Sequence, residues 1–222
     1  MKESELRRRL KELVSSLKGE VLGLVKVVAE EDLGGSEQYK EIISSYFNIE
    51  DLVFVPTPDL VLVFEGYDTV DGWELIAIEL KSIQSGEVKK VKKKMRQAFR
   101  EIGQPLRYYL LGYDVAILWH VFDEDIEDSL IQRYVSLIEE TLEKLKLCMR
   151  YYATKMTKEG KFILVSKYHT SKVELKYLIR WFSDVMRYCR NPLIYDEERR
   201  DHVVLKRREA IKLLMKIPGR RV

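Results

Sequence analysis

Two stretches of this chain are apolar at odd and even positions alike, and they constrain the fold more than any other feature. One reads WELIAIELKSI from Trp73, and the other reads VAILWHVF from Val115. Side chains alternate between the two faces of a strand, so strands of this kind lie inside a sheet that is covered on both faces. The sequence therefore predicts an α/β fold with a mixed central sheet flanked by helices. Its 222 residues, 46% of them hydrophobic, suffice for one medium domain with a sizeable core.

The remaining elements are predicted from the period of the apolar residues and from turn residues. Helices are expected over 3–30, from Ser36 to about 46, over 87–111 with a kink near Gly103 and Pro105, and over about 126–157, 171–190 and 197–216. Strands are expected over 52–55, 60–64, 73–83, 115–122 and 161–169. We expect residues 1–122 to hold an N-terminal helix and the α/β core. Residues 123–222 would form a mainly helical, basic extension packed on that core.

Composition narrows the class of protein. The chain has no uncharged apolar run of about 18 residues, which argues against a membrane span, and its charged N-terminus lacks the apolar stretch of a signal peptide. We therefore expect an intracellular, cytoplasmic protein. Cys148 and Cys189 are too few for a disulfide framework and do not have the spacing of a metal-binding pair. Charged residues make up 34% of the chain, a bias that is typical of proteins from hot environments.

Charge is distributed unevenly along the chain. Residues 1–150 carry a balance of −7, whereas residues 151–222 carry +10. A separate cluster at 87–100 holds seven basic residues and one acid. Basic stripes are typical of proteins that bind polyanions, although a solvated helix face has the same composition. The candidates for nucleic-acid contact are Lys89, Lys90, Lys92, Lys93, Lys94 and Arg96, together with Lys206, Arg207 and Arg208 nearer the C-terminus.

Charged residues stand at the ends of two predicted neighbouring strands. Pro58 and Asp59 open the strand at 60–64, and Glu79, Leu80 and Lys81 follow the apolar part of the strand at 73–83. Positions two apart share a face of a strand, so Glu79 and Lys81 project to the same side. Burying an unmatched charge costs several kcal/mol, so a pair in this place requires an explanation. It is either a structural ion pair at the sheet edge or a catalytic site.

This pattern resembles the PD-(D/E)XK nuclease superfamily, which includes restriction enzymes, archaeal Holliday junction resolvases and RecB-like nucleases. The resemblance covers residues 36–122, with PDLVLVF, ELIAIELKS, a basic helix and VAILWHVF in order. It implies a restriction-endonuclease-like core in which Asp59 and Glu79 bind a divalent metal and Lys81 completes the site. A glutamate on the preceding helix is common in the resolvase branch, for which Glu37 and Glu41 are both candidates. The RecB-like branch often adds QxxxY after the lysine, and Gln104 and Tyr108 have that spacing.

The chemistry of these residues supports the same function. Carboxylate oxygens such as those of Asp59 and Glu79 suit Mg²⁺ or Mn²⁺, which lowers the pKa of bound water and neutralises charge on a phosphate. Lys81 can orient the attacking water or stabilise the developing oxyanion. We therefore expect a metal-dependent DNA nuclease, structure-selective or non-specific and acting within strands or at their ends, with RNA as a further substrate left open. A homodimer is one assembly that would supply the two sites needed to cut both strands. The alternatives are a catalytically silent nucleic-acid-binding module on the same fold and a protein-interaction scaffold of a mobile element or virus.

Overall fold

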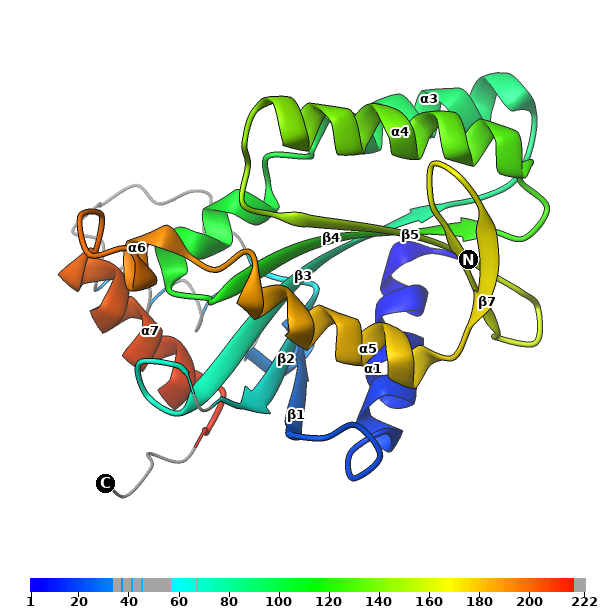
Figure 1. Cartoon of the computed structure of the whole chain (residues 1–222). Helices are drawn as coiled ribbons and strands as arrows, with labels where there is room; N and C mark the ends of the chain where they lie inside the picture. The colour runs from blue at the N-terminus through cyan, green and yellow to red at the C-terminus, as the bar shows by residue number, and fades with distance from the viewer. Residues whose placement is uncertain (34–36, 38–40, 42–44, 46–56, 67, 218–222) are drawn as a thin grey trace.

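A seven-stranded mixed sheet forms the centre of the computed structural model, which describes residues 1–33, 37, 41, 45, 57–66 and 68–217 (Figure 1). The strands are β1 (Leu24–Ala29), β2 (Leu60–Glu65), β3 (Trp73–Ile83), β4 (Val115–Asp123), β5 (Arg150–Met156), β6 (Phe162–Val165) and β7 (Thr170–Val173). They lie side by side in chain order. The pairs β3–β4 and β4–β5 are parallel and the other pairs are antiparallel. The sheet is therefore mixed, as predicted.

Helices cover both faces of this sheet, which is why its central strands are apolar on both sides. They are α1 (Glu3–Ser16), α3 (Val88–Arg100), α4 (Asp128–Lys144), α5 (Leu175–Asp184), α6 (Pro192–Tyr195) and α7 (His202–Leu214), with 3₁₀ turns η1 (Glu30–Leu33), η2 (Pro105–Leu111) and η3 (Val185–Arg187). Figure 1 shows α3 and α4 together on one side and α1 and α5 on the other. On the side of α1 and α5, Leu6, Leu10 and Phe182 pack with Ile76 and Trp119. The α/β arrangement predicted from the sequence is confirmed.

The predicted strands at 60–64, 73–83 and 115–122 are confirmed as β2, β3 and β4. Strand β4 lies between β3 and β5, and its apolar residues at both parities are buried, as expected for a central strand. The predicted helix at 87–111 is divided into α3 and η2, and the turn between them contains Gly103. Proline at the first position of η2 starts a new turn instead of continuing α3.

The predicted single helix over 3–30 is wrong beyond residue 16. Helix α1 ends at Ser16, and the chain then passes through Gly19 and Gly23, whose φ angles of +91° and +79° are accessible mainly to glycine. The β-branched run that follows forms β1. Leu24 fits the helical spacing of the apolar residues only by chance. It is buried as part of a strand and not of a helix.

The C-terminal part of the chain contributes three strands to the sheet as well as helices. Helix α4 ends at Lys144, Lys146 adopts a φ of +51°, and the rest of the predicted 126–157 helix is β5. Strand β6 confirms the strand predicted within 161–169, while β7 occupies the start of the predicted 171–190 helix. Helices α5, α6 and α7 account for the remainder. Because β5 pairs with β4, the sheet continues across the predicted boundary at residue 122.

Two predicted elements fall wholly or partly outside the described residues. The strand at 52–55 lies outside them altogether, and the helix after Ser36 is described only at residues 37, 41 and 45, which are helical. Cys148 and Cys189 are joined as a disulfide, with their Cα atoms 5.3 Å apart. The helices of the described part of the chain are too short or too polar to cross a membrane.

Candidate active site

The predicted acids and lysine come together where β2 begins and β3 approaches its end. The antiparallel register pairs Leu60 with Ile78, and one step further along the two strands Asp59 lies opposite Glu79. Opposed residues of an antiparallel pair project from the same face, and Lys81 projects from that face too. Residues of two neighbouring strands therefore form one cluster on the side of the sheet that α3 covers.

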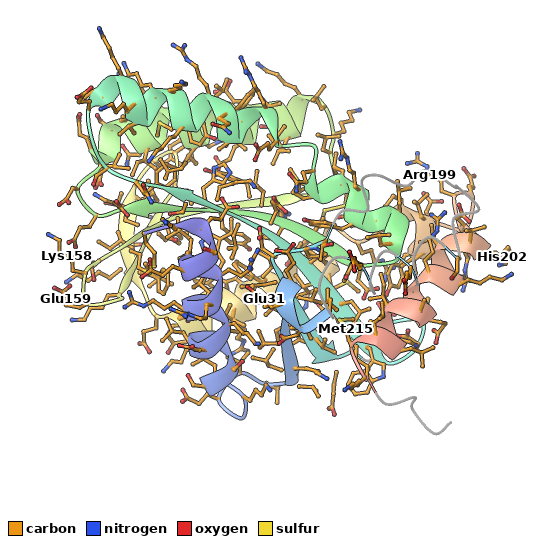
Figure 2. All side chains as sticks on the ribbon, turned by 180° about the vertical axis from the view of Figure 1, so that it is seen from behind. Glu31, Lys158, Glu159, Arg199, His202 and Met215 are labelled. Atoms are coloured by element: carbon orange, nitrogen blue, oxygen red, sulfur yellow. A yellow bond between two sulfur atoms is a disulfide. The ribbon has the colours of Figure 1, made fainter. Side chains whose placement is uncertain are left out.

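Asp59 is buried and both of its carboxylate oxygens have donors. Its Oδ1 accepts a hydrogen bond from Nη1 of Arg7 at 2.9 Å, and its Oδ2 accepts one from the backbone N–H of Leu80 at 2.8 Å. Arg7 belongs to α1 and also pairs with Glu30 and Glu31 of η1, Nε lying 3.0 Å from the Glu31 carboxylate. Glu31 is labelled in Figure 2 on the short segment between α1 and the sheet. Helix α1 thus brings a cation onto Asp59.

Glu79 is 2% exposed and is held by two neighbours. Its Oε1 lies 2.8 Å from Nζ of Lys81, and its Oε2 accepts a hydrogen bond from the hydroxyl of Tyr108, which is fully buried in η2. Nζ of Lys81 also lies 3.0 Å from Glu101 and 3.7 Å from Glu3. Tyr108, predicted from its spacing to Gln104, is therefore part of the cluster.

The electrostatics of the cluster favour additional positive charge. Burial and the nearby Asp59 carboxylate raise the pKa of Glu79 to about 7, and burial raises the pKa of Asp59 as well. Burial alone would lower the pKa of Lys81, but the attraction of Glu79 outweighs it and the pKa is raised, so Lys81 stays charged. Within the described residues, the carboxylates of Glu3, Glu30, Glu31, Asp59, Glu79 and Glu101 share the two cations Arg7 and Lys81, a formal excess of four negative charges.

Five residues of the cluster are not predicted from the sequence: Glu3, Arg7, Glu30, Glu31 and Glu101. Glu3 and Arg7 lie one helical turn apart on α1, Glu30 and Glu31 belong to η1, and Glu101 follows the end of α3. Spacing alone shows that Glu3 and Arg7 share a helix face, but it does not show that this face meets the end of β3. Within the described part of the chain, α1 brings the glutamate Glu3 to the site.

Other predicted residues differ from this cluster in exposure or in their partners. Glu37 and Glu41 are exposed. The Gln104 side chain is partly exposed and makes no hydrogen bond among the described residues. Arg208, predicted to contact phosphates, is 1% exposed and donates to Asp71, so its prediction as a phosphate contact is wrong.

A hollow of about 420 Å³ opens beside Lys81, and we call it the Lys81 hollow. Lys94 and Gln97 of α3 line it together with Glu3 and Glu101. Nζ of Lys94 lies 3.0 Å from the amide oxygen of Gln84, which also lines the hollow. The predicted basic residues at 89, 90, 92, 93 and 96 are exposed on α3, whereas Lys94 is half-buried beside this hollow.

The chain matches no protein-family model, no curated protein and no solved structure.

The donor set fits a divalent cation of the Mg²⁺ type in part. Asp59 and Glu79 present hard oxygen donors from opposed positions, and Mg²⁺ is commonly held by one or two carboxylates plus waters and substrate phosphates. Within the described residues, no group of three or more His, Cys, Asp or Glu side chains is placed to hold a metal. A cation held by these two acids would have to compete with Arg7 for Asp59 and with Lys81 for Glu79.

Proposed function

We propose that this protein is a metal-dependent deoxyribonuclease that hydrolyses phosphodiester bonds. The observation that carries the proposal is the pairing of Asp59 and Glu79 on opposed strands, both buried, with Lys81 2.8 Å from Glu79. The raised pKa values of both acids support it, because two buried carboxylates with an excess of negative charge bind a cation more readily than a balanced ion pair does. The order of strands and helices from β1 to β4 fits the restriction-endonuclease-like core that the motif implies.

Asp59 and Glu79 are the residues that would hold Mg²⁺ or Mn²⁺. A metal bound there supplies a Lewis acid for the phosphate and a water of lowered pKa. Release of Lys81 from both Glu79 and Glu101 would free its ammonium to bind a phosphate oxygen in the Lys81 hollow and to stabilise the negative charge that develops there. Tyr108 remains a hydrogen-bond donor to Glu79 and keeps that carboxylate in its orientation.

One observation favours a second candidate. All four oxygens of Asp59 and Glu79 already have protein donors. A nucleic-acid-binding module that has lost catalysis would retain such a closed ion cluster, because the charges would then serve stability alone. Metal binding and strand cleavage separate the two candidates.

A nicking assay on supercoiled plasmid with Mg²⁺ or Mn²⁺ tests the proposal, with the wild type compared with Asp59→Asn and Lys81→Ala. We expect the wild type to nick the plasmid and both variants to lose at least 100-fold in rate. A matched control is Glu159→Gln with Lys161→Ala, because this exposed pair has the same acid-x-Lys spacing in the turn before β6 (Figure 2). The control should retain full activity. Equal cleavage by wild type and Lys81→Ala would exclude this site.

Titration calorimetry with Mn²⁺ distinguishes the proposed nuclease from the catalytically silent module. The nuclease binds Mn²⁺ through Asp59 and loses that binding in Asp59→Asn. A protein that binds DNA but neither binds Mn²⁺ nor nicks plasmid is the silent module.

A further inference from the structure

A second hollow, on the other side of α3 from Lys81, has the chemistry of a site for unpaired nucleotides. This α3–α4 groove has a volume of about 380 Å³ and lies between the two helices. Figure 1 shows α3 and α4 side by side above the sheet, and Figure 2 shows the same pair from behind. Its walls combine cations with apolar and aromatic side chains, which is an unusual combination for an exposed surface.

The rim of the groove is positively charged. It carries Lys92, Arg96 and Arg100 from α3 and Arg133 from α4, and no acid lines it. All four side chains are exposed, and among the described residues none of them forms an ion pair with a carboxylate. The positive charges of the rim are therefore not neutralised within the described part of the protein and can bind an anionic ligand.

The floor of the groove is apolar and partly aromatic. Phe99 is half-buried there, Tyr134 contributes a largely buried ring, and Leu137 is 51% exposed. Leu137 is on the outer face of α4, where an apolar side chain has no part in the core. Cations alone would suffice for a duplex, whose bases are paired and stacked inside and whose phosphates face outward. An apolar floor between cations suits a strand whose bases are free to leave water.

We propose that the α3–α4 groove binds a single-stranded segment of nucleic acid, with phosphates on the four cations and unpaired bases on the floor. This inference rests on the proposed function only in naming nucleic acid as the substrate, and it narrows that substrate to one with an unpaired strand, such as a flap, an overhang or a free end. One helix diameter, about 10 Å, separates the groove from the Lys81 hollow, because α3 lines both. A strand that crosses α3 would therefore reach the acids.

Binding of a labelled twenty-nucleotide oligothymidine in EDTA tests this inference without cleavage. We expect it to bind at least tenfold more tightly than a blunt duplex of the same length. The slope of log affinity against log salt should be about −3, since each phosphate neutralised on a single strand contributes about −0.7. Neutralising the arginines in Arg96→Gln/Arg100→Gln/Arg133→Gln should reduce the slope by about two and the affinity at least tenfold.

Two further variants make the test specific to this groove. The control Lys158→Gln/Arg187→Gln/Arg199→Gln removes the same charge from exposed positions outside the groove, and Figure 2 labels Lys158 and Arg199 on opposite flanks of the molecule. It should change oligothymidine binding less than twofold. Leu137→Glu leaves every cation in place but puts a carboxylate into the groove, and it should weaken binding at least tenfold. Because Leu137 is half-exposed on a helix, this variant is expected to fold normally, which its melting temperature checks.

Three results would overturn the inference: equal affinity for strand and duplex, equal weakening by the groove variant and its control, or wild-type binding by Leu137→Glu. Competition by polyglutamate as strong as that by oligothymidine would assign the groove to an acidic protein partner instead. The nicking assay keeps this outcome apart from failure of the proposed function. A protein that binds the oligonucleotide through the groove without nicking DNA retains this inference and loses the nuclease. One that nicks DNA while the groove variants bind normally does the reverse.

Discussion

Strand β3 has a buried cluster of charges near each end, and the two clusters differ in balance. Near its C-terminal end, six carboxylates share Arg7 and Lys81. Before and beside its N-terminal end, Asp71, Asp114 and Glu209 face Arg208 and Lys212. Three acids and two bases are nearly balanced there, whereas the site carries a formal excess of four negative charges.

Hydrogen bonding is saturated in both clusters, so they differ in charge and not in the number of unsatisfied groups. All five N–H donors of Arg208 are used, by Asp71, Asp114 and the carbonyls of Gly112 and Trp73, at distances from 2.6 to 3.0 Å. Burial would raise the pKa of Asp71, but the hydrogen bond and charge of Arg208 lower it to about 2. Burial does raise the pKa of Asp114, which nevertheless accepts hydrogen bonds from three donors.

A nearly balanced cluster serves stability, whereas a cluster with a large excess of buried negative charge is suited to binding a cation. Glu74 lies near the balanced cluster but adds little charge to it at neutral pH. Burial raises its pKa to about 8, with Asp114 adding repulsion.

The largest effect is expected from Arg208→Met, which removes the cation of the balanced cluster. It would leave Asp71 and Asp114 buried without their main partner, and breaking a buried pair in this way costs about 3–5 kcal/mol. Urea denaturation measures the loss. The exposed Lys206→Met, two residues away on α7, is the matched control and should change the free energy of unfolding by less than about 0.5 kcal/mol. A loss of similar size in both variants would contradict the structural role of Arg208.

At the site, by contrast, a substitution is expected to increase the free energy of unfolding. Glu79→Gln should raise the free energy of unfolding at pH 8, because the wild-type carboxylate is ionised there although the fold disfavours its charge. Its pKa is raised from 4.5 to about 7, so this destabilisation grows as pH rises through that window and reaches about 3 kcal/mol at most above pH 7. Below pH 4.5 the carboxyl is neutral in both states and the advantage of Gln disappears.

Denaturation at pH 4.5 and pH 8 checks this sign, with the exposed Glu198→Gln as control. Glu79→Gln should gain stability and lose nuclease activity together, as expected where a site is destabilised for function. A variant that is less stable than wild type at pH 8 would make Glu79 a structural residue like Asp71.

The sequence predicted the part of the site that depends on local rules. Alternation along β3 places Glu79 and Lys81 on one face, and the short connection between β2 and β3 predicts the antiparallel pairing that brings Asp59 opposite them. Arg7 and Glu3 could not be predicted in this way, because the position of α1 against the end of β3 depends on packing between segments more than 50 residues apart in the chain.

Two errors of prediction had a signal in the sequence. The Lys-Arg-Arg run predicts a surface position for Arg208, yet Arg208 shares one face of α7 with Val204, Ile211 and Met215, all of which are buried. Helical phase would have placed it inside. The 3–30 helix followed a leucine spacing across two glycines, where the backbone requirement of glycine should have outweighed the spacing.

The affinity of the site for a metal should rise with pH, because its acids must be ionised to bind a cation. Binding needs an ionised Glu79, so affinity for Mn²⁺ should fall about tenfold per pH unit below about pH 7 and level off above it. The raised pKa of Asp59 would steepen the fall. Calorimetry from pH 5.5 to 8.5, in two buffers of different ionisation enthalpy, gives both the affinity and the protons released. An affinity independent of pH would mean that Glu79 is not a ligand.

The smallest effect is expected at Arg7, the cation of α1 that lies 2.9 Å from the Asp59 carboxylate. If Arg7 competes with the metal for Asp59, Arg7→Gln should bind Mn²⁺ more tightly, by about three- to tenfold, because the net contribution of such a hydrogen bond is about 1 kcal/mol. If Arg7 instead orients Asp59 for the metal, the same substitution should weaken binding. Arg8→Gln removes the neighbouring exposed charge on α1 and should leave the affinity unchanged. The direction of the change therefore decides whether the closed cluster is a resting state that a metal opens or a structural group like the one around Arg208.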